Sequence, residues 1–241
     1  MTTEVYLGSV LIPYLILAAA ALILVTRCDR GVRVAVTRCL FFAMLASEIV
    51  KQVVAVQTHV WITMVPLHFS STFYLSVGLS VFAKKFFRHA GQVLLFVGGV
   101  LMTGMIFVNP IAVLGDPTLV LTSHIRAHGY FYHMAVAFQL FVLLFSREYS
   151  IRYYDAHIFA LFVAFWGAIA IPGAFYFKMN FMGILVSYIP FLEKLRLAAG
   201  YPLYLTVYYA LLVLAVYAFL FVCKKLTRIR IFPAKLPLYK K

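Results

Sequence analysis

The sequence predicts an all-α fold, a multi-pass transmembrane helix bundle of about seven spans, with the N-terminus outside and the C-terminus cytoplasmic. Three observations predict it: the composition, the length of the apolar runs, and the distribution of basic residues between those runs. Hydrophobic residues make up 65% of the 241 positions, against about 45–50% in soluble domains. A soluble domain of this length has too little interior to bury so much apolar surface, whereas lipid tails solvate it.

Seven apolar runs of about 19–23 residues follow one another along the chain, each long enough to cross about 30 Å of hydrocarbon as a helix. The runs are continuous, which distinguishes them from the short alternating strands of a membrane β-barrel. We expect a single helix-bundle domain over residues 1–223 and a basic tail over 224–241. The predicted spans cover residues 5–26, 35–57, 63–83, 91–109, 124–146, 156–177 and 201–223.

The basic residues predict the orientation. The formal net charge is +14, and the chain has 21 Lys and Arg residues. If the N-terminus is outside, sixteen of them lie on the cytoplasmic side, four lie outside and Lys51 lies inside a span. This asymmetry is typical of cytoplasmic flanks of membrane helices. We therefore expect a multi-pass protein of the cell membrane, with membrane lipids as partners. We expect no nucleic-acid partner, because no basic stripe with interleaved aromatic residues lies in a soluble segment.

Three segments are less regular. Residues 109–123 contain two prolines and no Lys or Arg, which predicts an outer loop. Residues 181–192 are apolar but too short to span, which predicts a re-entrant or interfacial segment. Pro172 and Gly173 predict a kink or an end of the sixth helix.

Ionisable side chains inside the predicted spans indicate a site, because such groups cost about 2.5–3.5 kcal/mol in lipid and usually face partners inside the bundle. In the second span Glu48 and Lys51 are three residues apart, so they can pair, and the polar residues Ser47 and Gln52 flank them. In the third span, a four-residue spacing predicts one polar helix face. That face consists of His68, Thr72, Ser76 and Ser80.

In the fifth span His124 and His128 share a face that Tyr132 and Gln139 continue, while His133 points elsewhere. No acidic or Cys ligand accompanies the two histidines, so we expect neither a metal nor a cofactor. Glu48, His68 and His128 all fall in the outer half of the bilayer under the predicted topology. This common depth predicts a buried polar site near the outer leaflet, although helix packing alone also explains small polar residues in spans.

Several motifs spread over most of the chain carry a resemblance to a known family. They are the Ser47–Glu48 pair, VPLHFSS at 65–71, GMIFVNP at 104–110, RAHG at 126–129, KMNFMG at 178–183 and GYPLY at 200–204. With these motifs the chain resembles the YwaF-like family of bacterial integral membrane proteins, which is related to the vertebrate transmembrane protein 164 acyltransferase.

The resemblance implies a membrane-embedded acyl-lipid transferase or hydrolase with a catalytic set of Ser70, His128, Glu48 and His68. In the family a Cys accepts the acyl group and a His acts as its base; by position these roles fall on Ser70 and His128. Ser70 replaces the family's Cys, and a serine hydroxyl needs an adjacent base to act as a nucleophile. Ser70 also lies about 200° around an ideal helix from His68, so Ser71 is an alternative nucleophile.

Two other functions fit the same residues. Glu48, His68 and His128 can form a proton or solute path in a transporter or channel. Alternatively, the polar stripes serve helix packing in a non-catalytic membrane scaffold.

Overall fold

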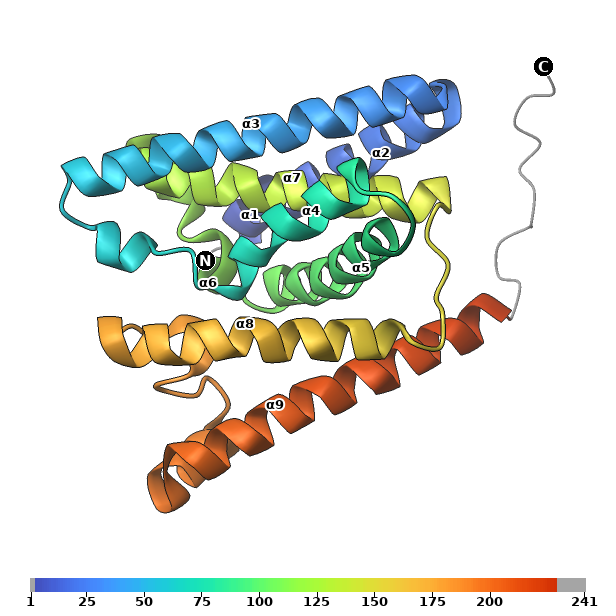
Figure 1. Cartoon of the computed structure of the whole chain (residues 1–241). Helices are drawn as coiled ribbons and strands as arrows, with labels where there is room; N and C mark the ends of the chain where they lie inside the picture. The colour runs from blue at the N-terminus through green and yellow to red at the C-terminus, as the bar shows by residue number, and fades with distance from the viewer. Residues whose placement is uncertain (1–2, 229–241) are drawn as a thin grey trace. The chain divides into compact units, whose positions relative to one another are not determined.

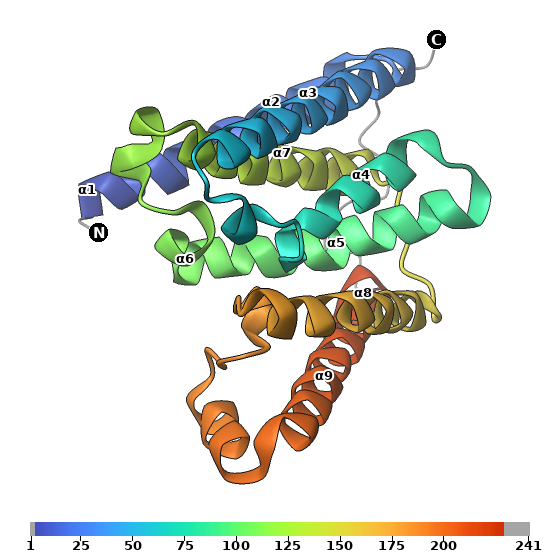
Figure 2. The same ribbon diagram turned by 60° about the vertical axis from the view of Figure 1, so that its left-hand side comes forward.

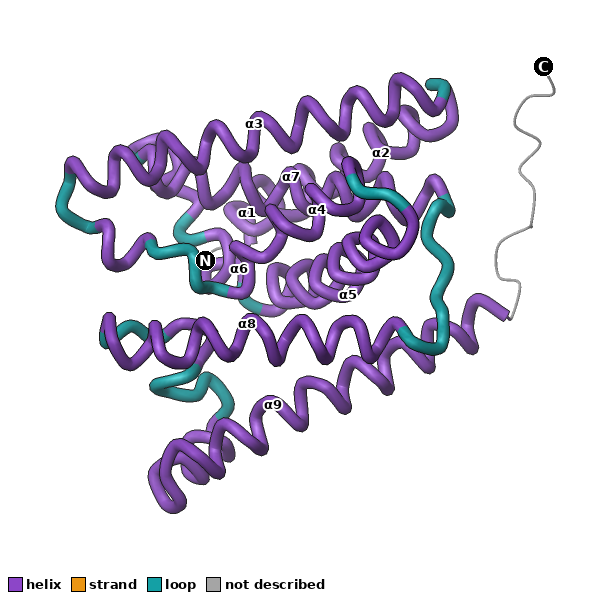
Figure 3. The backbone as a smooth tube through the Cα atoms, viewed as in Figure 1, coloured by secondary structure: helices purple, strands orange, loops and turns teal. Residues whose placement is uncertain are grey.

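The computed structural model describes residues 3–228, with only the backbone described for residues 3–4, 112, 117–118, 121 and 227–228. Throughout this described range the regular elements are helices joined by loops and turns (Figure 3). The predicted all-α class is therefore confirmed. The helices fall into two compact units, one made of residues 1–66 and 70–150 and the other of residues 67–69 and 151–241.

The described part of the first unit contains seven α-helices. Helices α3 and α4 both pack on α7, and α4 runs beside α5, as two views show (Figure 1 and Figure 2). A π-helical turn joins α1 to α2, so that α1, this turn and α2 form one continuous helix. The helices are α1 (Thr3–Tyr6), α2 (Ile12–Arg27), α3 (Arg30–Gln57), α4 (Phe73–Phe82), α5 (Lys85–Val108), α6 (Pro110–Leu114) and α7 (His124–Ser146).

Helix α3 begins five residues before the predicted span, and a capping residue explains the difference. The Asp29 side chain accepts a hydrogen bond from the Val32 backbone N–H at 2.9 Å, which satisfies one of the free donors of the first turn. The basic turn that begins at Arg30 therefore belongs to the helix. A hydropathy pattern alone places such polar turns outside the span.

The third predicted span, residues 63–83, is not one helix. Two 3-10 turns, Trp61–Met64 and Phe69–Thr72, precede α4, and the helical segment Phe69–Phe82 is shorter than the other spans. Pro66 lies between the two turns and has no backbone N–H to continue a helix. The predicted polar face therefore starts at Thr72, and His68 lies outside the helix.

Helices α4 and α5 form an antiparallel hairpin whose backbones come unusually close. A Cβ atom at Gly91 would lie only 2.5 Å from the Ser80 backbone nitrogen and 2.6 Å from the Leu79 Cβ. Only glycine fits at this contact. The hairpin holds α4 firmly despite its short length.

The second unit consists of α8 (Asp155–Phe177), a 3-10 turn at Phe181–Gly183 and α9 (Pro190–Arg228). Helix α8 continues through Pro172 to Phe177, where the predicted span also ends, and its C-cap Lys178 has a φ of 54°. Of the predicted kink or end at Pro172 and Gly173, an end there is therefore excluded. Gly200 interrupts α9 with a φ of 77°, and the predicted span from residue 201 starts at this break.

The short apolar segment after residue 180 folds against its own unit. The Asn180 side chain accepts hydrogen bonds from the Leu185 and Val186 backbone N–H groups at 2.9 and 3.0 Å. The Tyr208 hydroxyl donates to the Met182 carbonyl at 2.9 Å, and Phe181 and Ile184 are fully buried. Packing within the unit thus holds the segment.

Six of the described helices are long and apolar enough to cross a membrane. The protein is therefore an integral, multi-pass membrane protein that sits in a lipid bilayer. The predicted loop at 109–123 contains α6 and a 3-10 turn at Pro117–Thr122. The orientation, the single domain and the cell membrane as location stay predictions, and most of the basic tail, residues 229–241, lies outside the described residues.

Candidate functional site

The Glu48 carboxylate is the centre of a polar cluster between α3, α4 and α7. Its Oε1 lies 2.7 Å from the Lys51 Nζ and accepts a hydrogen bond from Gln52 Nε2 at 2.6 Å. Its Oε2 accepts a hydrogen bond from the Tyr74 hydroxyl at 2.9 Å and lies 3.0 Å from the His128 Nε2. Both oxygens thus have two donors each, and the expected Glu48–Lys51 pair forms. Such complete pairing is what an ionised carboxylate requires at membrane depth.

His128 lies between Glu48 and a serine hydroxyl. Its Nε2 faces the Glu48 carboxylate, and its Nδ1 lies 3.1 Å from the Ser47 Oγ. An ionised carboxylate can only accept hydrogen bonds, so it fixes the ring proton on Nε2 when the histidine is neutral. Nδ1 then carries the lone pair and can accept a hydrogen bond from the Ser47 hydroxyl.

The Ser47 hydroxyl has one proton and two acceptors within reach. One is the Met44 carbonyl of its own helix at 2.8 Å, and the other is His128 Nδ1 at 3.1 Å. Back-bonding to the helix is common for serine in membrane spans. Rotation of the hydroxyl between these acceptors switches the serine between a packing role and a hydrogen bond to the imidazole.

Two tyrosine rings hold the imidazole in place. The Tyr132 ring stacks on His128 with centroids 5.6 Å apart, and the Tyr74 ring packs on Tyr132 at 4.8 Å. The Tyr132 hydroxyl donates to the Ser70 backbone carbonyl at 2.6 Å. Tyr132 is one helical turn after His128, so the two rings share a face of α7.

The site lies partly buried beside a lipid-facing helix surface. The side chains of His128 and Glu48 are 8% and 14% exposed. The next residues of α3 turn outward: Ile49, Val50 and Val53 are all more than half exposed, as lipid-facing residues are. The outer face of α3 therefore lies directly beside the cluster.

The predicted site residues divide into two groups. Glu48 and His128 meet directly, as described above. Ser70 contributes its backbone carbonyl to Tyr132, and the hydroxyl bonded to the imidazole belongs to Ser47. His68 belongs to the second unit, where its ring meets Phe181 edge-on at a centroid distance of 5.1 Å.

The other polar residues of the fifth span have separate roles. His133 is buried and bonded through Nδ1 to the Gly129 carbonyl at 2.6 Å, and Gln139 donates to the Thr37 carbonyl at 3.1 Å. His124 is exposed at the start of α7. Among residues 3–228, no group of three or more His, Cys, Asp or Glu side chains could hold a metal ion.

No family model, curated protein or solved structure matches the chain. The resemblance to the YwaF-like family is therefore untested by these comparisons and stays an expectation.

Sequence reasoning missed Ser47 as the partner of His128. The signal was present, because Ser47 directly precedes Glu48 and lies four residues before Lys51 on the same helix face. What the sequence lacked was the pairing of α3 with α7, which decides that this hydroxyl and not Ser70 meets the imidazole. The resulting order is serine hydroxyl, imidazole, carboxylate, the arrangement that activates a hydroxyl for attack on a carbonyl carbon.

Proposed function

We propose that this integral membrane protein is an acyl-lipid transferase or hydrolase in which Ser47 is the nucleophile, His128 the general base and Glu48 the residue that orients the imidazole. The observation that carries the proposal is the hydrogen-bonded chain from Ser47 through His128 to Glu48. It retains the two residues, His128 and Glu48, that the family resemblance implies. It moves the nucleophile from Ser70 to Ser47.

The proposed reaction has two half-reactions. Ser47 Oγ attacks the carbonyl carbon of a lipid ester while its proton passes to His128 Nδ1. The ester C–O bond then breaks, and His128 returns the proton to the leaving alkoxide, which leaves the acyl group on Ser47. An acceptor alcohol or water attacks this acyl-enzyme, gives its proton to His128 and releases the new ester or the free acid, with the proton restored to Ser47.

Glu48 assists without changing its own protonation. The imidazolium formed in each half-reaction carries a positive charge, which the adjacent carboxylate stabilises. Lys51, Gln52 and Tyr74 hold that carboxylate in position. The Tyr132 ring fixes the plane of the imidazole, so the base stays aimed at the hydroxyl.

A lipid substrate follows from the location of the cluster. The serine lies on a membrane-spanning helix whose neighbouring residues face lipid. An acyl chain in the bilayer meets this surface directly, whereas a water-soluble ester has to leave water to reach it.

The decisive experiment is labelling with a lipophilic fluorophosphonate, which phosphonylates activated serine hydroxyls. We expect purified protein to be labelled on Ser47, and His128→Ala to lose the label by at least about a hundredfold, since a general base contributes about 10²–10⁴-fold. Ser76→Ala is the matched control, because the Ser76 hydroxyl donates to the Phe73 carbonyl of its own helix, α4. Labelling of Ser70 in place of Ser47, or labelling that survives His128→Ala, would refute the assignment.

Activity is tested separately by lipidomics of cells that express each variant. Wild type, Ser70→Ala and Ser76→Ala should give one acyl profile, and Ser47→Ala and His128→Ala should both give that of cells without the protein. Identical profiles in all five strains would remove acyl transfer from consideration.

A proton path is the second candidate, because three titratable side chains form a connected row inside the predicted spans. Lys51 contacts Glu48, and Glu48 contacts His128. The Ser47→Ala variant distinguishes the two functions, because acyl transfer needs the Ser47 hydroxyl and the proton path does not. Proton-coupled uptake into proteoliposomes that survives Ser47→Ala but not Glu48→Gln would favour transport over acyl transfer.

A further inference from the structure

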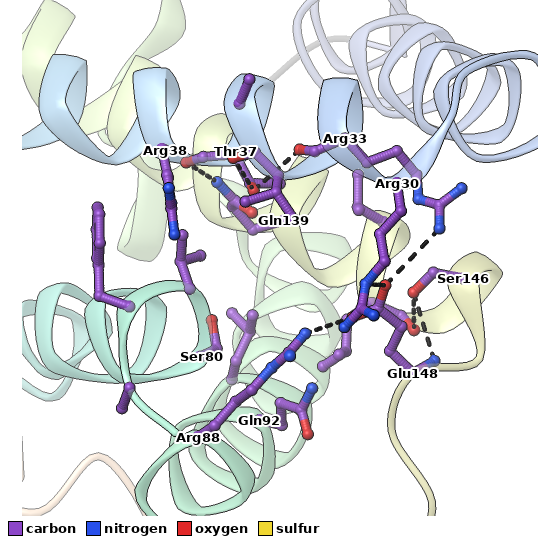
Figure 4. A pocket seen from close by; sticks show the side chains of 18 of the residues that line it. Arg30, Arg33, Thr37, Arg38, Ser80, Arg88, Gln92, Gln139, Ser146 and Glu148 are labelled. Atoms are coloured by element: carbon purple, nitrogen blue, oxygen red, sulfur yellow. Dashed lines mark hydrogen bonds and ion pairs between the residues drawn. The ribbon is translucent and has the colours of Figure 1, made fainter. Parts of the chain in front are cut away.

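A second polar feature of the first unit lies away from the Ser47 cluster. It is a cavity of about 820 Å³ where the start of α3, the end of α4, the start of α5 and the end of α7 meet (Figure 4). Along α3, Thr37 at this cavity is ten residues from Ser47, which is about 15 Å at 1.5 Å per residue. We call it the basic pocket, and ligand binding there does not depend on the proposed acyl-transfer chemistry.

The basic pocket carries more positive charge than its single carboxylate can neutralise. Within the described part of the chain, five cations line it, with one acidic residue, Glu148. Arg30, Arg33 and Arg88 converge on Glu148, with nitrogen–oxygen distances of 4.0, 3.8 and 2.6 Å (Figure 4). One negative charge thus serves three guanidinium groups. The remaining two cations are Arg38 and Lys84.

Two buried donors of the pocket have no acceptor among the described residues 3–228. They are the Nε atoms of Arg33 and Arg88. Buried guanidinium donors are almost always paired, because an unpaired one loses its hydration and gains nothing in return. The planar guanidinium fork matches the oxygens of a phosphate group. The two unsatisfied donors therefore point to a phosphate-like anion as the missing partner.

The rest of the basic pocket is lined by both polar and apolar residues. The uncharged polar residues include Thr37, Ser80, Gln92, Gln139 and Ser146. Phe42, Phe82 and Leu95 line it together with several valines, and Arg38 lies over the Phe82 ring at 5.3 Å from its centroid. A small soluble anion contacts only the charged and polar residues of such a cavity. A molecule with a phosphate head and a hydrocarbon tail also covers the apolar residues.

The location selects a membrane lipid. All four helix ends at the pocket belong to elements that run through the bilayer or pack on them, and the predicted topology puts these ends at the cytoplasmic surface. Basic pockets between transmembrane helices on that side bind anionic lipid headgroups. We propose that the basic pocket is a binding site for the phosphate headgroup of an anionic phospholipid of the inner leaflet.

The test is native mass spectrometry of the purified full-length chain in mild detergent, with phosphatidylglycerol and phosphatidylcholine added in competition. We expect wild type to retain phosphatidylglycerol preferentially, and Arg88→Gln to lower that retention roughly tenfold, since a hydrogen bond to a charged group is removed. Arg30→Gln is the second variant. Its side chain is 67% exposed, so its loss should leave folding intact while it weakens phosphatidylglycerol binding to a smaller extent.

Lys85→Gln is the matched control, because Lys85 is an exposed cation at the same helix end but does not line the pocket. The proposal predicts that this variant binds like wild type. Equal retention of the two lipids by wild type, or equal losses in Lys85→Gln and the two arginine variants, would overturn it. A parallel thermal-shift series with inorganic phosphate separates the sources: stabilisation by phosphate as large as that by phosphatidylglycerol would overturn the lipid assignment in favour of a soluble anion.

Discussion

Replacing Glu48 by glutamine tests whether its carboxylate balances charge inside the membrane. The variant keeps the shape of the side chain but leaves the Lys51 ammonium, 2.7 Å away and 13% exposed, without its counter-ion. Breaking a buried ion pair in this way costs about 3–5 kcal/mol, and a lysine at the centre of a membrane helix costs about 2.5–3.5 kcal/mol on insertion scales. Both estimates give a loss of about 3 kcal/mol, or about a hundredfold in the folded-to-unfolded ratio.

The assay is reversible unfolding in mixed micelles, with sodium dodecyl sulfate titrated against a mild detergent and the transition followed by tryptophan fluorescence. The informative companion is the double variant Glu48→Gln with Lys51→Met, which removes both charges. We expect it to regain most of the lost stability, because replacing both partners of a buried pair is often neutral. A Glu48→Gln protein as stable as wild type, or a double variant no better than the single one, would refute the reasoning.

Three further predictions concern the backbone, each read out in the same unfolding assay. Gly91→Ala should destabilise by about 1–3 kcal/mol, because its Cβ would lie 2.5 Å from the α4 backbone, whereas Gly104→Ala, with nothing within 4 Å, should be neutral or stabilising; equal effects would contradict the close packing of the hairpin. Asp29→Ala removes the cap of α3 and should cost about 1 kcal/mol, while Asp29→Ser should cost less. Gly200→Ala forces a side chain onto a φ of 77° and should cost about 1–2 kcal/mol; an unchanged midpoint would mean that α9 is continuous there.

The fold was largely predictable because lipid imposes one rule on every span. A backbone in hydrocarbon must satisfy its own hydrogen bonds, so each apolar run of sufficient length becomes a helix. The predicted bounds 124–146 coincide with α7, and 156–177 differ from α8 by one residue. The misses occur where hydropathy says little: the polar first turn of α3, capped by Asp29, and the region around Pro66, where 3-10 turns replace the expected helix.

The candidate site was predictable only in part. The positions of Glu48 and His128 along their spans predicted the same membrane depth for both, because the rise of a helix is fixed at about 1.5 Å per residue. Rotation about each helix axis and the choice of neighbour are not fixed by hydropathy. These decide that Ser47, not Ser70, bonds to the imidazole.

The sequence by itself determined that this is a helical membrane protein and which polar residues lie inside its spans, since the cost of exposing apolar side chains to water and polar ones to lipid acts on each segment alone. Only the tertiary structure decided which of those residues touch. Side-chain contacts between α3, α4 and α7, and the meeting of three arginines at Glu148, depend on how helices pack against one another. That packing arises from many weak contacts between segments far apart in the chain.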